Sequence, residues 1–224
     1  MERYNTKQMT KKGPFETNTD EYEEWFEENR FVYEAELRAV KKLLPTEGES
    51  IEIGVGSGRF AVPLGIRLGI DPSLKMAEIA VKQGIKVHEG VAEDLPFDDS
   101  RFDFALMVTA ICFLKDAKTA LREAYRILKP RGSLVIGLVD RISPLGKKYE
   151  KYKAGNKFYR EASFYSTDEV VSLMTDAGFG NFAFTQTIFR DLKDIDNTEA
   201  VKEGYGEGSF IVIRGEKQGL GGGN

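Results

Sequence analysis

Short apolar runs alternate with helical patterns along most of the chain. Runs with the length of buried strands occur at residues 50–53, 67–71, 85–89, 102–108 and 133–139. Segments with helical spacing occur at residues 58–65, 72–83, 117–128 and 167–177. Strands that alternate with helices predict a parallel sheet covered by helices on both faces.

Two further patterns flank this region. Residues 182–189 and 209–214 have strand patterns with no helix-sized pattern between them, which predicts an antiparallel hairpin at one edge of the sheet. Before the first strand, residues 20–45 have apolar positions at three- and four-residue steps, with an interruption near Asn29. This segment predicts an N-terminal cap of two helices, closed by Pro45.

Local signals indicate where the elements should end. Pro72 suits the start of a helix, and Gly178 should stop the helix that Thr167 is expected to cap. Residues 129–132 are expected to form a turn before the fifth strand.

Three segments lie outside the alternating pattern. Residues 1–18 are polar and predict a frayed arm, and residues 218–224 are rich in glycine and predict a disordered tail. Residues 140–165 are long for a connection and rich in tyrosine and phenylalanine, which predicts a partly helical lid over a pocket. The length of 224 residues predicts one domain, residues 1–224.

Composition narrows the class of protein. The chain has 32 basic and 36 acidic residues and a net charge of -4, so no nucleic-acid partner is expected. Cys112 is the only cysteine, which excludes an intrachain disulfide and a cysteine metal cluster. The chain begins without the apolar core of a signal peptide, and no apolar run reaches the roughly 18 residues of a membrane span. A cytoplasmic protein without a membrane partner is expected.

The strongest chemical signal is a glycine-rich segment after the first strand. Gly54, Gly56 and Gly58 occupy alternate positions behind an apolar run that contains Glu52. A strand that enters glycines and then a helix is typical of a nucleotide site, because glycine lets the backbone approach a ligand. A carboxylate beside the loop repels a pyrophosphate and attracts an ammonium group. A ligand with a free amino group is therefore favoured over NAD.

Spacing and two other strand ends support this interpretation. In the dinucleotide fingerprint Gly-x-Gly-x-x-Gly, read from Gly54, the third glycine would fall at position 59, which is Arg59. A P-loop would end in Gly-Lys-Ser/Thr, whereas this segment ends in Gly58-Arg59-Phe60. Asp71 follows the second strand, where a carboxylate can accept hydrogen bonds from a ribose diol. Residues 90–97 follow the third strand and form a loop that could hold an adenine.

These residues resemble a known family, the class I S-adenosylmethionine-dependent methyltransferases of the small-molecule branch that includes ubiquinone/menaquinone-type enzymes. Residues 51–60 resemble its first motif, and residues 92–97 followed by 101–103 its middle region. Residues 121–136, LREAYRILKPRGSLVI, resemble its last motif. The resemblance implies an α/β Rossmann-like fold with a seven-stranded, mostly parallel sheet, an antiparallel edge hairpin and helices on both faces.

The resemblance also implies S-adenosylmethionine as the cofactor and assigns contacts to it. The glycines would pass beneath its methionine part, Glu52 would lie near its ammonium group, and Asp71 would bind the ribose. Residues of two later loops would flank the adenine and line the floor near the methyl group. The implied cofactor-binding residues are Tyr22, Trp25, Glu52, Gly54, Gly56, Gly58, Asp71, Pro72, Ala92, Glu93, Asp94, Thr109 and Ala110.

Several candidates have a plainer interpretation. Tyr22 and Trp25 belong to an apolar stripe that most simply forms a core face, and two acids such as Glu93 and Asp94 are often only solvated. His88 is the only histidine and is expected to be structural, and Cys112 a core or pocket residue. Candidates for acceptor contact, each with packing as an equal alternative, are Arg141, Tyr149, Phe158, Tyr159 and Tyr165.

The chain departs from the family pattern at two places. Val91 stands where relatives commonly have an acid that accepts a hydrogen bond from the adenine amino group. Cys112 and Phe113 stand where many relatives have a histidine pair. Glu93, Asp94 or a backbone carbonyl would then have to replace the missing acid.

The predicted function is methyl transfer to a small-molecule acceptor by in-line displacement. The accepting atom is N, O or C, with an amine among the candidates. An activated donor needs positioning more than acid–base catalysis, so no catalytic base is named. One alternative is a regulator that binds the cofactor without transferring its methyl group. The missing acid at Val91 motivates it. Another is a dinucleotide-dependent oxidoreductase, against which Arg59 counts.

Overall fold

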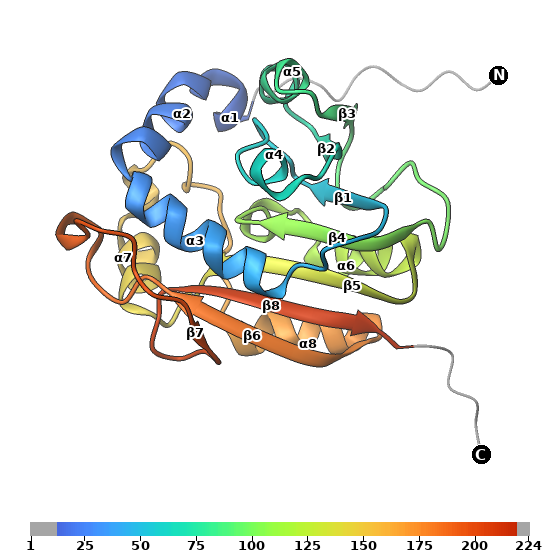
Figure 1. Ribbon diagram of the computed structural model, residues 1–224. Coiled ribbons are helices and arrows are strands. Elements are labelled where there is room, and N and C mark those ends of the chain that lie inside the picture. Colours follow the sequence, from blue (N-terminus) through green and yellow to red (C-terminus); the bar gives the residue numbers. More distant parts are fainter. Residues whose placement is uncertain (1–12, 219–224) are drawn as a thin grey trace.

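A central sheet organises the fold. The computed structural model describes residues 13–218, so residues 1–12 of the predicted arm (1–18) and residues 219–224 of the predicted tail (218–224) lie outside the described residues. The eight strands have the order β3-β2-β1-β4-β5-β8-β6-β7 (Figure 1). They are β1 (Ser50–Ile53), β2 (Leu68–Asp71), β3 (Lys86–Glu89), β4 (Phe102–Val108), β5 (Leu128–Val139), β6 (Phe179–Thr187), β7 (Lys202–Glu203) and β8 (Phe210–Lys217).

The strand pairing confirms the predicted fold class. β3, β2, β1, β4 and β5 pair in parallel, as alternating strands and helices predict. β8 is antiparallel to both β5 and β6, so the predicted hairpin forms, with β8 inserted between the other two strands. The two-residue strand β7 adds to the seven strands expected and lies at the edge.

Helices cover both faces of the sheet. They are α1 (Pro14–Thr17), α2 (Thr19–Glu28), α3 (Arg30–Leu43), α4 (Ala61–Leu64), α5 (Leu74–Lys82), α6 (Ala117–Ile127), α7 (Pro144–Tyr152) and α8 (Thr167–Ala177). Short 3-10 turns occur at η1 (Ile111–Phe113), η2 (Lys153–Gly155) and η3 (Leu192–Asp194). In Figure 1, α3 lies in front of the sheet, and α6 and α8 lie behind it.

Alternating side chains of the strands pack into two hydrophobic cores. On β4, Ala105 and Met107 join the core beneath α6 and α8, and Phe104 and Leu106 join the core beneath α3. Because both faces are buried, the strand contains apolar residues at successive positions. The sheet is therefore rigid where its strands end, and residues at those ends are held in place.

The structure corrects several predicted element ends. α1 forms within the segment predicted to be a frayed arm. α5 begins at Leu74 with Ser73 as its cap, so Pro72 precedes the helix. Ser166, and not Thr167, caps α8, because its hydroxyl and the Glu169 carboxylate complete a capping box.

The predicted turn at residues 129–132 is a bulge inside a longer strand. Phe102 pairs with Leu128 and Phe104 with Ser133, so the extra residues of β5 loop out of the ladder. Arg131 has φ of +67° and supplies the left-handed position within this bulge. The strand consequently starts directly after α6.

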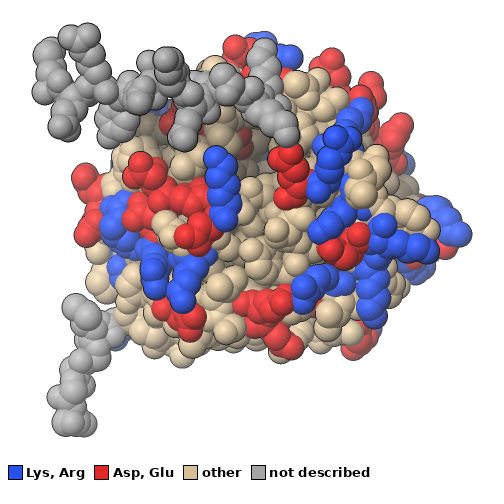
Figure 2. All heavy atoms as spheres, turned by 180° about the vertical axis from the view of Figure 1, so that it is seen from behind, with Lys and Arg blue, Asp and Glu red and all other residues tan. Residues whose placement is uncertain are grey.

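Charged side chains of both signs spread over the surface. Figure 2 shows Lys and Arg among Asp and Glu across the face opposite to that of Figure 1. Among the described residues, no helix has the length and apolar character needed to cross a membrane.

Candidate functional site

A large cavity opens at the carboxyl ends of the parallel strands. Its volume is about 1560 Å³, and its floor includes Gly54 after β1, Asp71 at the end of β2 and Thr109 after β4. Single small-molecule pockets typically occupy about 300–1,000 Å³, so this cavity has room for two ligands. In open α/β sheets this edge is where ligands bind.

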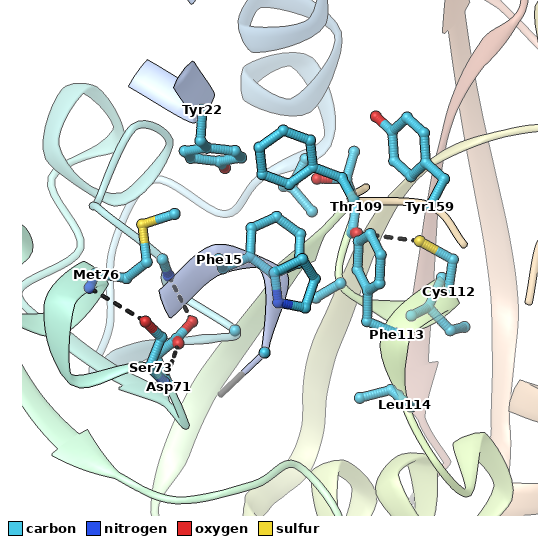
Figure 3. A pocket seen from close by; sticks show the side chains of 18 of the residues that line it. Phe15, Tyr22, Asp71, Ser73, Met76, Thr109, Cys112, Phe113, Leu114 and Tyr159 are labelled. Atoms are coloured by element: carbon cyan, nitrogen blue, oxygen red, sulfur yellow. Dashed lines mark hydrogen bonds between the residues drawn. The ribbon is translucent and has the colours of Figure 1, made fainter. Parts of the chain in front are cut away.

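Figure 3 shows the two sides of this cavity. Asp71, Ser73 and Met76 lie on one side, and Cys112 and Tyr159 on the other, with the labelled Phe15 between them.

The glycine loop forms part of the floor, and its glycines serve different purposes. All three have positive φ, with +76° at Gly54, +51° at Gly56 and +89° at Gly58. A Cβ on Gly54 would lie 2.7 Å from the Cβ of Ala110, and one on Gly58 would lie 2.6 Å from Cδ1 of Ile85. Gly54 and Gly56 line the cavity, whereas Gly58 packs against the protein interior.

Asp71 ties the glycine loop to the start of α5. Its Oδ2 accepts a 2.8 Å hydrogen bond from the backbone N–H of Gly56, and its Oδ1 accepts one of 2.8 Å from Ser73. Burial raises the pKa of this carboxyl, and these two hydrogen bonds oppose the rise. Each carboxylate oxygen keeps a lone pair, so Asp71 can still accept hydrogen bonds from ligand hydroxyls.

Glu52 lies beneath the same loop without a cation. Its side chain is buried, and within the described chain its Oε2 accepts no hydrogen bond. Burial raises the pKa of Glu52 well above its ordinary value; the Ala61 N–H opposes the rise and the Asp71 charge adds to it. A buried acid with a free oxygen favours a cationic partner. Among the described residues, no ion pair joins Glu52 to a lysine or arginine.

The residues after β4 have an unusual backbone. Thr109 has φ of +50°, which is rare for a β-branched residue, and its N–H donates to Gly137 O over 2.8 Å. The turn places the carbonyl of Thr109 where it accepts a 3.3 Å hydrogen bond from the Cys112 thiol. Thr109 and Ala110 both line the cavity. Backbone strain at a cavity floor is typical of a binding site.

The loop after β3 contributes unevenly. Ala92 is buried and lines the cavity. Glu93 also lines it, but its Oε1 accepts hydrogen bonds of 2.8 Å from Lys115 N and 3.2 Å from Asp116 N. Asp94 is exposed and lies outside the lining.

The N-terminal helices roof the cavity. Tyr22 and Trp25 of α2 line it, and both contact the buried ring of Phe26. Arg59 anchors α2 over the glycine loop through a 2.7 Å ion pair with Glu23. The residue that breaks the dinucleotide fingerprint therefore holds the roof in place.

The segment before α2 also belongs to the roof. The Phe15 ring lies 4.9 Å from that of Phe113 and 5.6 Å from that of Tyr22. Glu16 accepts a 2.6 Å hydrogen bond from Ser73 Oγ, which attaches α1 to the start of α5.

Aromatic residues of the predicted lid form the far wall. Tyr149, Phe158, Tyr159 and Tyr165 line the cavity. Arg141 lies outside the lining and instead pairs with Glu169 at 2.7 Å. Residues 140–165 are partly helical through α7 and η2, and their role as a lid stays a prediction.

Comparisons with known proteins agree with this site. A family model described as a methyltransferase domain matches residues 51–136. An uncharacterised protein of Methanocaldococcus jannaschii is 47% identical over 203 residues, which are 91% of this chain and 98% of that protein. A crystal structure of an S-adenosylmethionine-dependent methyltransferase from Thermotoga maritima, a possible histamine N-methyltransferase, is 56% identical with a TM-score of 0.90, covering 92% of this chain and 98% of that one.

The chain belongs to the S-adenosylmethionine-dependent methyltransferase family. A ubiquinone/menaquinone biosynthesis C-methyltransferase of Citrobacter koseri is more distant, with 30% identity over 124 residues, 47% of this chain and about half (49%) of that protein. The resemblance stated from the motifs is confirmed, and the protein is an enzyme whose cofactor is S-adenosylmethionine.

The residues of this methyltransferase fit that cofactor. The free oxygen of buried Glu52 suits an ammonium group, and the glycine loop leaves its backbone open to a ligand. Of the thirteen residues that the resemblance implied, ten line the cavity and three do not, namely Glu52, Gly58 and Asp94. Their individual binding roles stay predictions.

Phe15, Glu16 and Glu36 are among the side chains of the methyltransferase cavity that sequence reasoning missed. The first two lie in the presumed arm, where only tertiary contacts indicate a role. Glu36 carries a readable signal, because Val32, Glu36 and Val40 follow one another at four-residue steps and all are buried. An acid within an apolar helical stripe is a candidate for a buried functional group.

Proposed function

We propose that this methyltransferase transfers a methyl group to a small-molecule acceptor, and that a nitrogen atom accepts it. The enclosed cavity of about 1560 Å³ carries the proposal, because it has room for an acceptor beside the cofactor. The relationship to the Thermotoga maritima protein, a possible histamine N-methyltransferase, supports nitrogen as the accepting atom. Mixed surface charges give no extended basic face for a nucleic acid on the side drawn in Figure 2.

Cofactor binding is assigned to the Asp71 side of the cavity. Asp71 would accept hydrogen bonds from the ribose hydroxyls, and Glu52 would neutralise the ammonium group. Gly54 and Gly56 would lie beneath the methionine part, and Ala92 beside the adenine. The orientation of Asp71 by two backbone N–H groups supports its part, because an acceptor that is already aligned loses little entropy on binding.

Positioning, and not proton transfer by a poised base, is the chain's main contribution. S-adenosylmethionine, when bound, supplies a methyl group already activated on a sulfonium. Burial raises the pKa of Tyr22 and of Tyr159, so both remain neutral phenols at physiological pH. Burial also raises the pKa of Cys112 to about 12, which keeps it a thiol and makes it a poor nucleophile. The aromatic walls exclude water and align the acceptor.

Calorimetric titration with S-adenosylmethionine, S-adenosylhomocysteine and NADH tests the cofactor site. Both methyl-cycle ligands should bind, and Asp71→Ala should weaken them at least tenfold, about 1.4 kcal/mol. Asp98→Ala is the matched control, because Asp98 is an exposed acid outside the cavity lining. Equal affinity of wild type and Asp71→Ala would refute the assigned ribose contact.

Transfer of a labelled methyl group to a panel of amines, phenols and carboxylic acids then tests the acceptor. Exclusive labelling of O or C atoms would refute nitrogen as the accepting atom.

A further inference from the structure

A carboxyl group without a partner lies in the wall of the cavity, away from the glycine loop. Glu36 on α3 is 6% exposed and lines the cavity. Within residues 13–218 it makes neither a hydrogen bond nor an ion pair, and burial alone raises its pKa to about 8. Buried acids normally have such partners, because removing a carboxylate from water is costly. The missing partner is the observation to be explained.

A structural role does not explain this residue. Glu36 occupies the buried stripe of α3 between Val32 and Val40, where an apolar side chain would pack without any desolvation cost. By contrast, Glu34 on the same helix is bonded to Thr198 Oγ1 over 2.6 Å. An acid that is kept buried and unpaired at a cavity wall is positioned for a ligand that brings the opposite charge.

Two tyrosines line the same cavity as Glu36. The rings of Tyr149 and Tyr159 are stacked with centroids 4.9 Å apart. Burial raises the pKa of both phenols, and the charge of Glu36 adds to the rise. Aromatic faces attract cations as a carboxylate does, so the group of three favours a cationic nitrogen.

The charge of the whole cavity agrees with this preference. Among residues 13–218, eight acidic residues line it, against two basic ones. Of these two, Lys157 is paired with Glu21. The excess of acids disfavours an anionic acceptor and raises the local concentration of cations.

We propose that Glu36 binds a cationic nitrogen of the methyl acceptor, an ammonium or imidazolium group, between its carboxylate and the Tyr149–Tyr159 pair. This inference rests on the proposed function and specifies its substrate class as small amines. Recognition and transfer use different states of nitrogen, because a protonated nitrogen has no lone pair for attack. Glu36 is therefore a binding residue, and a second, neutral nitrogen of the acceptor takes the methyl group from the sulfonium and then releases its proton to solvent.

Calorimetry on the protein saturated with S-adenosylhomocysteine tests the proposal. The probes are histamine and tyramine, and tyrosol is the neutral hydroxyl counterpart of tyramine. Wild type should bind at least one amine, and bind tyramine more tightly than tyrosol. Glu36→Gln should weaken amine binding at least tenfold and leave tyrosol unchanged, whereas Glu36→Asp, which keeps the charge, should keep part of the preference. Glu78→Gln is the control, because Glu78 is an exposed acid of α5.

The outcomes separate this inference from the proposed function. Failure of wild type to bind S-adenosylhomocysteine would refute the cofactor site itself. Normal cofactor binding with no amine binding, or with equal affinity for tyramine and tyrosol, would overturn the role of Glu36 alone. Unchanged amine affinity in Glu36→Gln would do the same. If Glu36→Gln does not fold, as judged by circular dichroism, the wild-type comparison of tyramine with tyrosol and the Glu36→Asp titration decide.

Discussion

Replacing Glu36 with glutamine should stabilise the ligand-free protein, increasingly so as pH rises. In the folded state burial raises the pKa of Glu36 from 4.5 to about 8. The folded chain therefore binds this proton more tightly than the unfolded chain does. The resulting stability is fully present below about pH 4.5 and is lost as pH rises through about 8. Glutamine keeps the shape of the side chain but carries no charge at any pH, so the variant avoids the loss.

The structure sets an upper limit for this effect. One pKa unit corresponds to about 1.4 kcal/mol, so the difference between 4.5 and about 8 limits the gain to about 5 kcal/mol above pH 9. Near pH 5 the two proteins should be almost equally stable. Such a gain is large against the total stability of about 5–15 kcal/mol that single domains have.

Urea denaturation of both proteins at pH values from 5 to 9 measures the difference directly. The free energy of unfolding of Glu36→Gln should grow with pH relative to that of wild type. The slope of this free energy against urea concentration should be the same for both proteins. Glu78→Gln, at an exposed position, should show no such trend. A stability difference that is constant across this pH range would refute the conclusion that Glu36 is buried without a partner.

Two further predictions concern the floor and the roof of the cavity. Gly54→Ala should lower the free energy of unfolding, measured by thermal unfolding, by about 1–3 kcal/mol more than Gly65→Ala does. Both glycines have φ of +76°, but only a Cβ on Gly54 would meet a neighbour, the Cβ of Ala110 at 2.7 Å. Equal losses would contradict the steric argument. Phe15→Ala should release S-adenosylhomocysteine several-fold faster in stopped-flow fluorescence, because the ring packs against the cavity walls, whereas Val81→Ala, at an exposed position on α5, should not change the rate.

Elements set by local patterns could be predicted from the sequence. The predicted bounds of the first and fourth strands match β1 and β4, and the interruption near Asn29 is where α2 gives way to α3. In these cases the signal lies within a few neighbouring residues, such as an apolar run or a break in helical spacing. The hairpin was predictable for the same reason.

Features that depend on distant partners could not be predicted. The bulge at residues 129–132 follows from the register between β4 and β5, which no local pattern specifies. α1 has only four residues and is held by contacts of Phe15 and Glu16 with later segments. The motifs indicated the side of the cavity that is proposed to bind the cofactor, but they carry no information on the side proposed for the acceptor. There, position in the fold and not sequence spacing brings α3 next to the lid.

The two buried acids show how stability and ligand binding oppose each other in this enzyme. Glu52 and Glu36 each lie buried without a cation, and burial raises the pKa of both. Neither acid helps the empty protein fold, because a desolvated carboxylate is costly unless it is paired. A ligand cation removes that cost, so the binding energy of each ligand should include relief of a penalty already present in the fold. Under the proposed roles, the same positions that limit stability in the absence of ligands would therefore select ligands that carry positive charge.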